Sequence, residues 1–343
     1  MVDRDYIIAA FSYLGEVIVS VTEGGNTVMD KAISDSCSDN YWFTKTNILK
    51  ALHSIADRML VAEKLNIWTN RYRFNTSIPK RVGLIMAGNI PLVGFHDFLT
   101  ILLSGNIAVI KPSSKDRYLI KSLCEILINR FPLLAKRIIF TDNKPESVDA
   151  AIATGSNNSA RYFYEEYKDI PLLARKNRYS SAILGGDESP DELAALGDDI
   201  FSYFGLGCRN VSNIFVPANY DWKLFWSSIE KYSDILNHKG YNDCFRYRKA
   251  ILDLSEKNYL TNGFVMMVEH YPSFSSIAAI NYMSYNSIEQ IKVFLEDQKD
   301  KIQCVVSHID EIEHKIPFGF SQQPELTDYA DGIDTMKFLQ ELR

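Results

Sequence analysis

Between residues 81 and 142, short apolar runs alternate with longer segments of helical periodicity, and this alternation constrains the fold most strongly. The runs "RVGLIMAG" (81–88), "NIAVIKPSS" (106–114) and "RIIFTD" (137–142) have the length and composition of buried strands. The intervening segments, "NIPLVGFHDFLTILLSG" (89–105) and "KDRYLIKSLCEILINRF" (115–131), are typical of a loop feeding a helix and of a helix. Such alternation predicts parallel βαβ units and a doubly wound sheet of dinucleotide-binding type.

The phosphate-binding fingerprint common in such sheets is absent from this sequence. No GxGxxG follows any of the expected strands, so a nucleotide must be held by other groups. After the third strand, "ESVDAAIA" (146–153) is expected to be a helix that leads into "TGSNNSARYFYEEY" (154–167). Ligands of such sheets lie beyond the carboxyl ends of the strands, which directs attention to residues just after each apolar run.

A second α/β pattern begins near residue 181. It comprises "SAILGG" (181–186), a helix over "PDELAALGDDIFSYFG" (190–205), a loop with Cys208 and the strand "VSNIFVPA" (211–218). Further strands and a helix are expected at residues 263–271, 276–285, 287–298 and 302–308. We therefore expect four regions: a helical N-terminal part packed on the cofactor domain (1–75), a nucleotide-binding α/β domain (76–182), a catalytic α/β domain (183–316) and a C-terminal segment (317–343).

Composition excludes several classes of function. A net charge of −6 argues against a broad nucleic-acid surface, and no apolar run approaches the roughly 20 residues of a membrane span. The first residues carry Asp3, Arg4 and Asp5 without a long apolar centre, so we expect no signal peptide. The cysteines lack CxxC spacing and the six histidines form no cluster, which favours reduced thiols in a cytoplasm and no metal.

Cys208 stands out because it follows two glycines, Gly205 and Gly207, and precedes an apolar strand. A free cysteine is most often a small, buried hydrophobic residue. The alternative is a nucleophile held where a substrate can reach it. Local sequence alone leaves both interpretations open.

Six short motifs, in a fixed order along the chain, bear on the family to which the chain is similar. They are "AGNIP" (87–91), "IKPSS" (110–114), "ATGS" (153–156), "ILGG" (183–186), "GLGC" (205–208) and "PFGF" (317–320). This set resembles the aldehyde dehydrogenase superfamily, and the chain is most similar to the fatty acyl-CoA reductases related to the reductase subunit of bacterial bioluminescence. The resemblance covers about residues 75–343. It implies an aldehyde dehydrogenase-like α/β fold of two doubly wound domains, for cofactor binding and catalysis, with a helical N-terminal part.

The resemblance also assigns catalytic roles. Cys208 matches the family nucleophile, whose thiolate attacks a carbonyl carbon to form a thioester. Asn89 matches the asparagine whose amide joins the backbone N–H of the cysteine in an oxyanion hole. Without the resemblance, Asn89 before Ile90 and Pro91 would be interpreted as a turn residue.

Cofactor contacts are implied at several positions. Lys111 and Ser113 match residues that bind the adenosine ribose, and Ser114 with Lys115 offers groups for a 2′-phosphate, which favours NADPH over NADH. Thr154, Gly155 and Ser156 match the segment at a helix N-terminus that faces the pyrophosphate. Gly185 and Glu269 complete the cofactor candidates, Glu269 as the nearest match for a contact with the nicotinamide ribose.

Two departures from the family pattern shape the expected reaction. Ile183 occupies the position in "ILGG" where oxidising members carry the glutamate that activates water, and Leu206 stands where many relatives have glutamine. Without that glutamate, an acyl-enzyme would persist for exchange with a thiol. The resemblance thus implies NADPH-dependent reduction of a long-chain acyl-CoA to its aldehyde, with acyl carrier protein as another donor and a homodimer as the assembly. Two alternatives are an acyl-phosphate reductase of the semialdehyde-forming type and a non-catalytic scaffold that binds nucleotide or acyl carrier.

Overall fold

The computed structural model describes residues 2–21, 27–73, 78–155 and 157–342, and the chain divides into two compact units. Unit 1 comprises Met1–Asn177 and Gln323–Arg343, and unit 2 comprises Arg178–Gln322. The division precedes the strand Tyr179–Ile183, which is hydrogen-bonded on both sides to strands of unit 2. For this reason it lies five residues before the boundary expected from sequence, and the final 21 residues return to unit 1.

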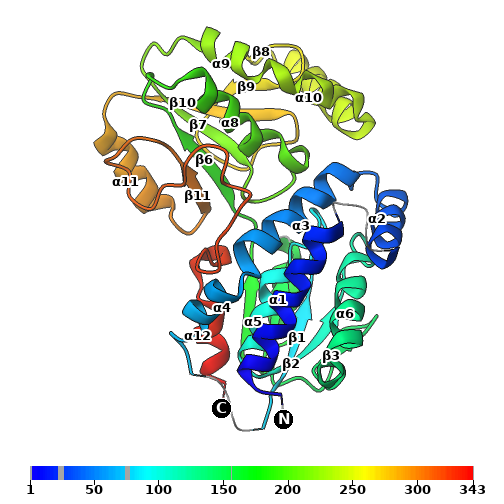
Figure 1. The fold of residues 1–343 in the computed structure, drawn as a ribbon. Coiled ribbons are helices and arrows are strands. Elements are labelled where there is room, and N and C mark those ends of the chain that lie inside the picture. The colour runs from blue at the N-terminus through cyan, green and yellow to red at the C-terminus, as the bar shows by residue number, and fades with distance from the viewer. Residues whose placement is uncertain (1, 22–26, 74–77, 156, 343) are drawn as a thin grey trace. The chain divides into compact units, whose positions relative to one another are not determined.

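Unit 1 is built on a five-stranded parallel sheet with the order β3-β2-β1-β4-β5, of which Figure 1 labels β1, β2 and β3. The strands are β1 (Arg81–Ile85), β2 (Ile107–Lys111), β3 (Ile138–Phe140), β4 (Ala150–Thr154) and β5 (Leu172–Arg175). The chain steps outward from β1 to β3 and then returns to the other side of β1. The order of strands therefore reverses between β1 and β4, and ligands of open α/β sheets bind beyond the strand ends at such a point.

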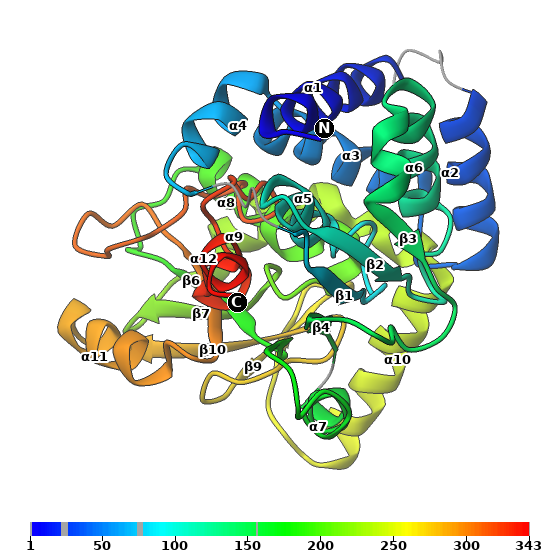
Figure 2. The same cartoon turned by 90° about the horizontal axis from the view of Figure 1, so that it is seen from below.

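Helices cover both faces of this sheet. They are α1 (Arg4–Val21), α2 (Thr27–Asp39), α3 (Lys45–Met59), α4 (Ala62–Thr69), α5 (Phe95–Leu103), α6 (Leu119–Arg130), α7 (Asn157–Glu166) and α12 (Thr335–Gln340). Helices α1, α5 and α6 share one apolar core with Leu84 and Ile110, whereas α7 covers the opposite face, where Tyr167 packs against Ile85 (Figure 2). The doubly wound arrangement expected from sequence is confirmed.

One predicted element is wrong. Residues 146–153 were expected to be helical, but Ala150–Thr154 form β4 between β1 and β5. Alanine favours helices in isolation, yet Ala150, Ala151 and Ala153 are completely buried in the sheet. Burial on both faces of a parallel sheet outweighs the small difference in intrinsic propensity.

Unit 2 contains a six-stranded sheet with the order β11-β6-β7-β10-β9-β8. Its strands are β6 (Tyr179–Ile183), β7 (Val211–Pro217), β8 (Leu260–Thr261), β9 (Met266–Glu269), β10 (Ala279–Tyr285) and β11 (Ile302–Val306). All are parallel except the edge strand β8.

Helices α8 (Pro190–Phe201), α9 (Trp222–Ile229), α10 (Lys239–Leu254) and α11 (Ile288–Gln298) complete the unit. Side chains of α8 and α9 share one apolar core with one face of β7. Side chains of α11 share a second apolar core with the opposite face of β7. Short 3₁₀ segments occur at Pro132–Lys136, Ser202–Gly205, Glu230–Asn237 and Ala330–Gly332. Among the residues that the structure describes, no helix combines the length and apolarity needed to cross a membrane.

Candidate active site

Cys208 lies in a tight loop between α8 and β7, and it is exposed and not in a disulfide. The loop begins with three consecutive residues in the left-handed region, Tyr203, Phe204 and Gly205, with φ of 53°, 58° and 76°. Glycine adopts this conformation freely, but for tyrosine and phenylalanine it costs on the order of 1–3 kcal/mol each. Such a backbone persists only where surrounding contacts enforce it.

The enforcing contacts come from Asn210, which is 3% exposed. Its Oδ1 accepts the Gly207 N–H at 2.8 Å. Its Nδ2 donates to the carbonyls of Asp199, Ile200 and Ser202 at 3.1, 3.2 and 2.8 Å. One buried amide thus joins the end of α8 to the residue just before Cys208. The loop that carries the thiol is therefore rigidly held.

A second brace joins this loop to residues 317–322. Asp199 accepts the Gly319 N–H at 2.6 Å and the Ser321 N–H at 2.9 Å, and Arg209 donates from Nε to the Ser321 carbonyl at 2.6 Å. Burial raises the pKa of Asp199 to about 6 despite these bonds. The "PFGF" motif and the residue after Cys208 therefore share one hydrogen-bonded network.

The strand β6 contacts the same loop through Ser180. Its hydroxyl donates to the Cys208 carbonyl at 2.9 Å, and its Oγ lies 3.1 Å from the sulfur of buried Cys304. Ser180 is paired with Val211 at the amino end of β7. Cys208 is thus anchored at the amino-terminal edge of the parallel sheet.

The expectation that Ile183 occupies the position of the water-activating glutamate is wrong. Ile183 is paired with Phe215, at the opposite end of β6 from Ser180, and is fully buried in the core under α11. Three residues of extended strand separate Ile183 from Ser180 by about 10 Å. The motif "ILGG" therefore cannot occupy the position of a base next to Cys208, because β6 and β7 run in the same direction.

Gly185 and Glu269 are also not brought together with Cys208. Gly185 follows the carboxyl end of β6, where its N–H donates to Glu188 Oε1 at 2.5 Å. Glu269 is exposed at the carboxyl end of β9 and is level with Tyr282 of β10. Both lie toward the edge of the sheet opposite to Cys208, so within unit 2 they form no common site with the thiol.

In unit 1, the predicted cofactor residues converge on one cavity of about 540 Å³. Lys111, Ser113, Ser114 and Thr154 all line it. The cavity lies beyond the carboxyl ends of β1, β2 and β4, where the order of strands reverses. Its remaining lining residues are Ile85, Met86, Pro112, Arg117, Lys121, Asp142 and Phe163.

Gly155 adjoins this cavity at the start of α7. A Cβ at this position would lie 2.8 Å from Ser159 Cβ and 3.1 Å from the Phe163 ring, so the helix can begin this close to β4 only with glycine. Ser156, the other residue predicted here, lies outside the described residues. Thr154 and Gly155 thus place a helix N-terminus beside the cavity, which suits an anion.

Sequence reasoning missed two cations of the cavity, Arg117 and Lys121. Arg117 forms an ion pair with Asp39 of α2 at 2.6 Å, and Lys121 lies in the first turn of α6. Both follow "IKPSS" within eight residues along the chain, a proximity that could have linked them to the cofactor site. Together with Lys111 they give the cavity three cations against one carboxylate, that of Asp142.

Asn89 is exposed on the loop after β1, and this loop packs against the cavity wall. A Cβ at Gly88 would lie 2.5 Å from Ser113 Oγ, so only glycine fits between the two loops. Beyond Asn89, the Leu92 N–H donates to Asp116 Oδ2 at 2.7 Å. Burial raises the pKa of Asp116 to about 7, and its Oδ1 has no hydrogen-bond partner among the described residues. Asp116 therefore fixes the Asn89 loop to the loop that carries Ser113.

The family is decided by comparison with known sequences. A model of the acyl-CoA reductases (LuxC) matches residues 40–222, which is more than half of the chain and includes Asn89, Lys111 and Cys208. The chain belongs to this family. Membership of the acyl-CoA reductase family makes the protein an oxidoreductase of aldehyde-related chemistry. The comparison with curated proteins found no match.

Solved structures confirm an aldehyde dehydrogenase fold. Aldehyde dehydrogenase 21 from Physcomitrella patens, in complex with the reaction product succinate, aligns with a TM-score of 0.67 at 12% identity, over 97% of this chain and 84% of that one. The aldehyde dehydrogenase of Mycobacterium tuberculosis complexed with NAD+ aligns with a TM-score of 0.61 at 14% identity, over 86% of this chain and 71% of that one. An indole-3-acetaldehyde dehydrogenase of P. syringae with NAD+ aligns with a TM-score of 0.63 at 11% identity, over 84% of this chain and 69% of that one.

Proposed function

We propose that this member of the acyl-CoA reductase family reduces a long-chain acyl-CoA to the aldehyde with NADPH, through a thioester on Cys208. The observation that carries the proposal is the loop of Cys208, which exposes one thiol on a backbone enforced by Asn210. A merely structural cysteine is buried and needs no such support. This loop also lies within the span matched by the family.

The chemistry proceeds in two balanced steps. The Cys208 thiolate attacks the thioester carbonyl of acyl-CoA, and the tetrahedral intermediate expels the CoA thiolate and leaves an acyl group on sulfur. A nicotinamide bound in unit 1 would supply hydride to that carbonyl carbon. The resulting hemithioacetal oxyanion then collapses, which releases the aldehyde and regenerates the Cys208 thiolate.

From the resemblance, we propose Asn89 as a hydrogen-bond donor to both oxyanions. Gly88 and Asp116 hold its loop in place from either side. Removal of one such donor commonly lowers kcat by about 10²–10³. Asn89→Ala is therefore expected to lower kcat by that factor while the amount of bound cofactor stays unchanged.

Hydrolysis of the acyl-enzyme would be slow. Asp199, the carboxylate that braces the Cys208 loop, is buried and already accepts two backbone N–H bonds. Such a carboxylate does not reach a solvent molecule to activate it. The acyl group is thereby kept for hydride transfer.

The charges of the unit 1 cavity support NADPH as the reductant. We assign to this cavity a nicotinamide dinucleotide, held by the helix N-terminus at Gly155 and the hydroxyls of Ser113 and Thr154. Lys121 is our candidate for a 2′-phosphate, because its ion pair with the exposed Asp142 is long, at 4.0 Å. A charge-assisted bond to phosphate contributes about 1.5–3 kcal/mol. Lys121→Ala should therefore raise KM for NADPH by roughly tenfold or more and leave KM for NADH unchanged.

The remaining parts of the proposal rest on the resemblance. They are a long acyl chain, coenzyme A or acyl carrier protein as the donor, a homodimer and a cytoplasmic location. The cavity that Phe204 and Gly205 line in unit 2 measures only about 30 Å³, so a long chain must be bound elsewhere.

The test is aldehyde formation from acyl-CoA, measured together with NADPH oxidation. We expect one aldehyde per NADPH from the native enzyme and none from Cys208→Ala, with full activity in Cys244→Ala as the matched control. Turnover of acyl phosphate but not acyl-CoA would favour the semialdehyde-type reductase. NADPH binding without turnover of either would favour the non-catalytic scaffold.

A further inference from the structure

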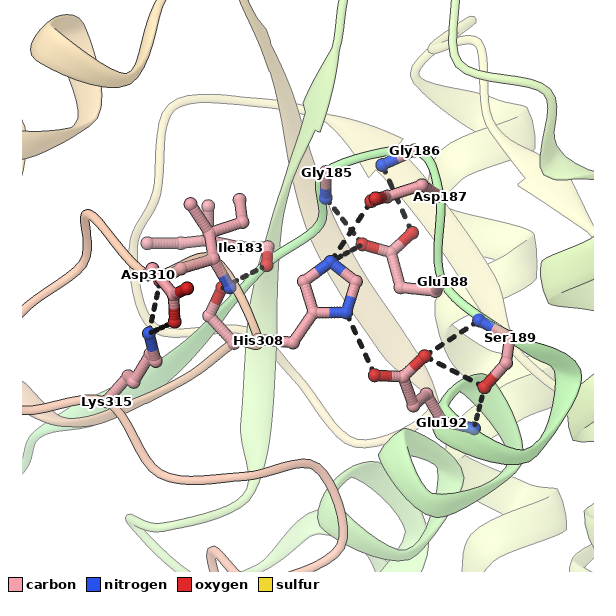
Figure 3. Close-up of polar contacts among 12 residues, drawn as sticks. Ile183, Gly185, Gly186, Asp187, Glu188, Ser189, Glu192, His308, Asp310 and Lys315 are labelled. Atoms are coloured by element: carbon pink, nitrogen blue, oxygen red, sulfur yellow. Dashed lines mark hydrogen bonds and ion pairs between the residues drawn. The ribbon is translucent and has the colours of Figure 1, made fainter.

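A group of potential metal ligands lies in unit 2 at the sheet edge opposite to Cys208. It combines Asp187 and Glu188, from the turn between β6 and α8, with His308, which follows β11. Figure 3 shows the imidazole of His308 with Asp187 and Glu188 on the side of one ring nitrogen and Glu192 on the side of the other. More than 110 residues separate His308 from these acids, so the sequence offered no sign of the group.

The spacing of the donor atoms matches that of a metal site. His308 Nε2 lies 3.1 Å from Asp187 Oδ1 and 3.7 Å from Glu188 Oε1, and the three atoms all lie within 4.8 Å of one another. In a tetrahedral Zn²⁺ site with bonds of about 2.0–2.1 Å, donor atoms are separated by roughly 3.3 Å. One imidazole nitrogen and two carboxylate oxygens are ligands that Zn²⁺ accepts, with solvent as the fourth.

The support around His308 is that of a metal-bound imidazole. Its Nδ1 lies 2.9 Å from Glu192 Oε1, and Glu192 is itself fixed by the capping box with Ser189 at the start of α8. A ligating histidine typically donates its second N–H to a carboxylate, which orients the ring and leaves the other nitrogen for the metal. Glu192 performs this role here.

Two further observations, the balance of charge and the space left by a glycine, point to a bound cation. The Glu188 side chain is only 1% exposed, and its carboxylate accepts the N–H groups of Gly185 and Gly186. In the described chain, the carboxylates of Asp187, Glu188 and Glu192 form ion pairs with His308 and with no lysine or arginine. Three carboxylates around one imidazole leave an excess of negative charge, part of it buried. Moreover, a Cβ at Gly185 would lie 2.6 Å from Asp187 Oδ1 and 3.3 Å from His308 Nε2, so the donors converge where glycine leaves room.

We infer that Asp187, Glu188 and His308 bind one Zn²⁺ ion, with Glu192 orienting the histidine. The ion joins the carboxyl ends of β6 and β11 to the start of α8, the helix whose other end leads to the Cys208 loop. Its role is structural. The inference is independent of the proposed reductase activity, and it differs from the expectation of no metal drawn from the sequence.

The test is calorimetric titration of Zn²⁺ into the full-length chain after treatment with chelator. Cys208→Ser serves as the parent, because an exposed thiol could bind Zn²⁺ itself. We expect one ion per chain, no comparable binding of Mg²⁺, and a higher midpoint of thermal unfolding with Zn²⁺. His308→Asn should abolish binding, whereas the matched change His314→Asn, at an exposed histidine of the neighbouring loop, should leave it intact.

Two more variants protect the test against misfolding. Asp187 is 82% exposed, so Asp187→Asn should fold normally and weaken Zn²⁺ binding at least roughly tenfold. Glu192→Gln, which keeps a hydrogen bond but loses the charge, should weaken it by about 10–100-fold. Absence of saturable binding in the parent would overturn the inference, as would equal binding in His308→Asn and His314→Asn.

Discussion

Asn210→Ala tests most sharply how the chain holds its thiol in place. The buried side-chain amide takes part in hydrogen bonds through three hydrogen atoms. Its two N–H hydrogens are shared among the carbonyls of Asp199, Ile200 and Ser202, and its oxygen accepts the Gly207 N–H. At about 1 kcal/mol for each hydrogen bond, the substitution should lower the free energy of unfolding by about 3 kcal/mol. The strained backbone at residues 203–205 should also relax. The rate of Cys208 acylation should therefore fall by more than the small increase in the unfolded fraction of the protein would explain.

Two measurements separate these effects. Urea unfolding gives the global loss, and hydrogen exchange of the Gly207 N–H reports local opening of the loop. Asn237→Ala is the matched control, because Asn237 is exposed and its side chain forms one bond of 3.3 Å to Asp234; its stability should change by no more than about 0.5 kcal/mol. If Asn210→Ala stays within about 1 kcal/mol of the native chain and exchange at Gly207 is unchanged, the account of the loop is wrong.

Three further outcomes are expected in unit 1. Gly88→Ala places a Cβ 2.5 Å from Ser113 Oγ and should raise KM for the cofactor, and adding Ser113→Gly, which removes the obstructing atoms, should restore much of the loss. Burial raises the pKa of Asp116 to about 7, above its value in the unfolded chain. Ionisation of Asp116 should therefore lower the free energy of unfolding as pH rises from about 4 to about 7. Asp116→Asn should remove this pH dependence in urea unfolding and make the chain more stable than the native one at about pH 8. Arg175→Ala should cost about 3–5 kcal/mol in urea unfolding, because it leaves Asp97 as a buried, uncompensated charge, whereas adding Asp97→Ala should recover part of that loss.

The hydrophobic periodicity of the sequence predicted the strands and helices correctly wherever a short window of residues was enough to identify the element. The apolar runs at 81–88, 106–114 and 137–142 became β1, β2 and β3, and the segment 115–131 contains α6. The exception, residues 146–153, is rich in alanine, which is compatible with either a helix or a buried strand. Its partners β1 and β5 decide the outcome, and no short window of sequence contains them.

The candidate site was predictable only in part, for a physical reason. Lys111, Ser113 and Thr154 could be placed because the carboxyl ends of neighbouring parallel strands meet at one edge. Ile183 was misplaced because the order of motifs along a chain does not reveal at which end of a strand each one lies. The Asp199–Gly319 bond spans 120 residues, and His308 lies 121 residues from Asp187, so neither contact leaves a local pattern.

The central claim is that Cys208 carries the acyl group, and intact-protein mass spectrometry tests it most directly. The native chain and Cys208→Ala are each incubated with long-chain acyl-CoA in the absence of nicotinamide. We predict an added mass of one acyl group on the native chain, located at Cys208 by digestion, absent from Cys208→Ala, and released as aldehyde when NADPH is added. An adduct that persists in Cys208→Ala, or one on Cys208 that NADPH does not release, would contradict the account.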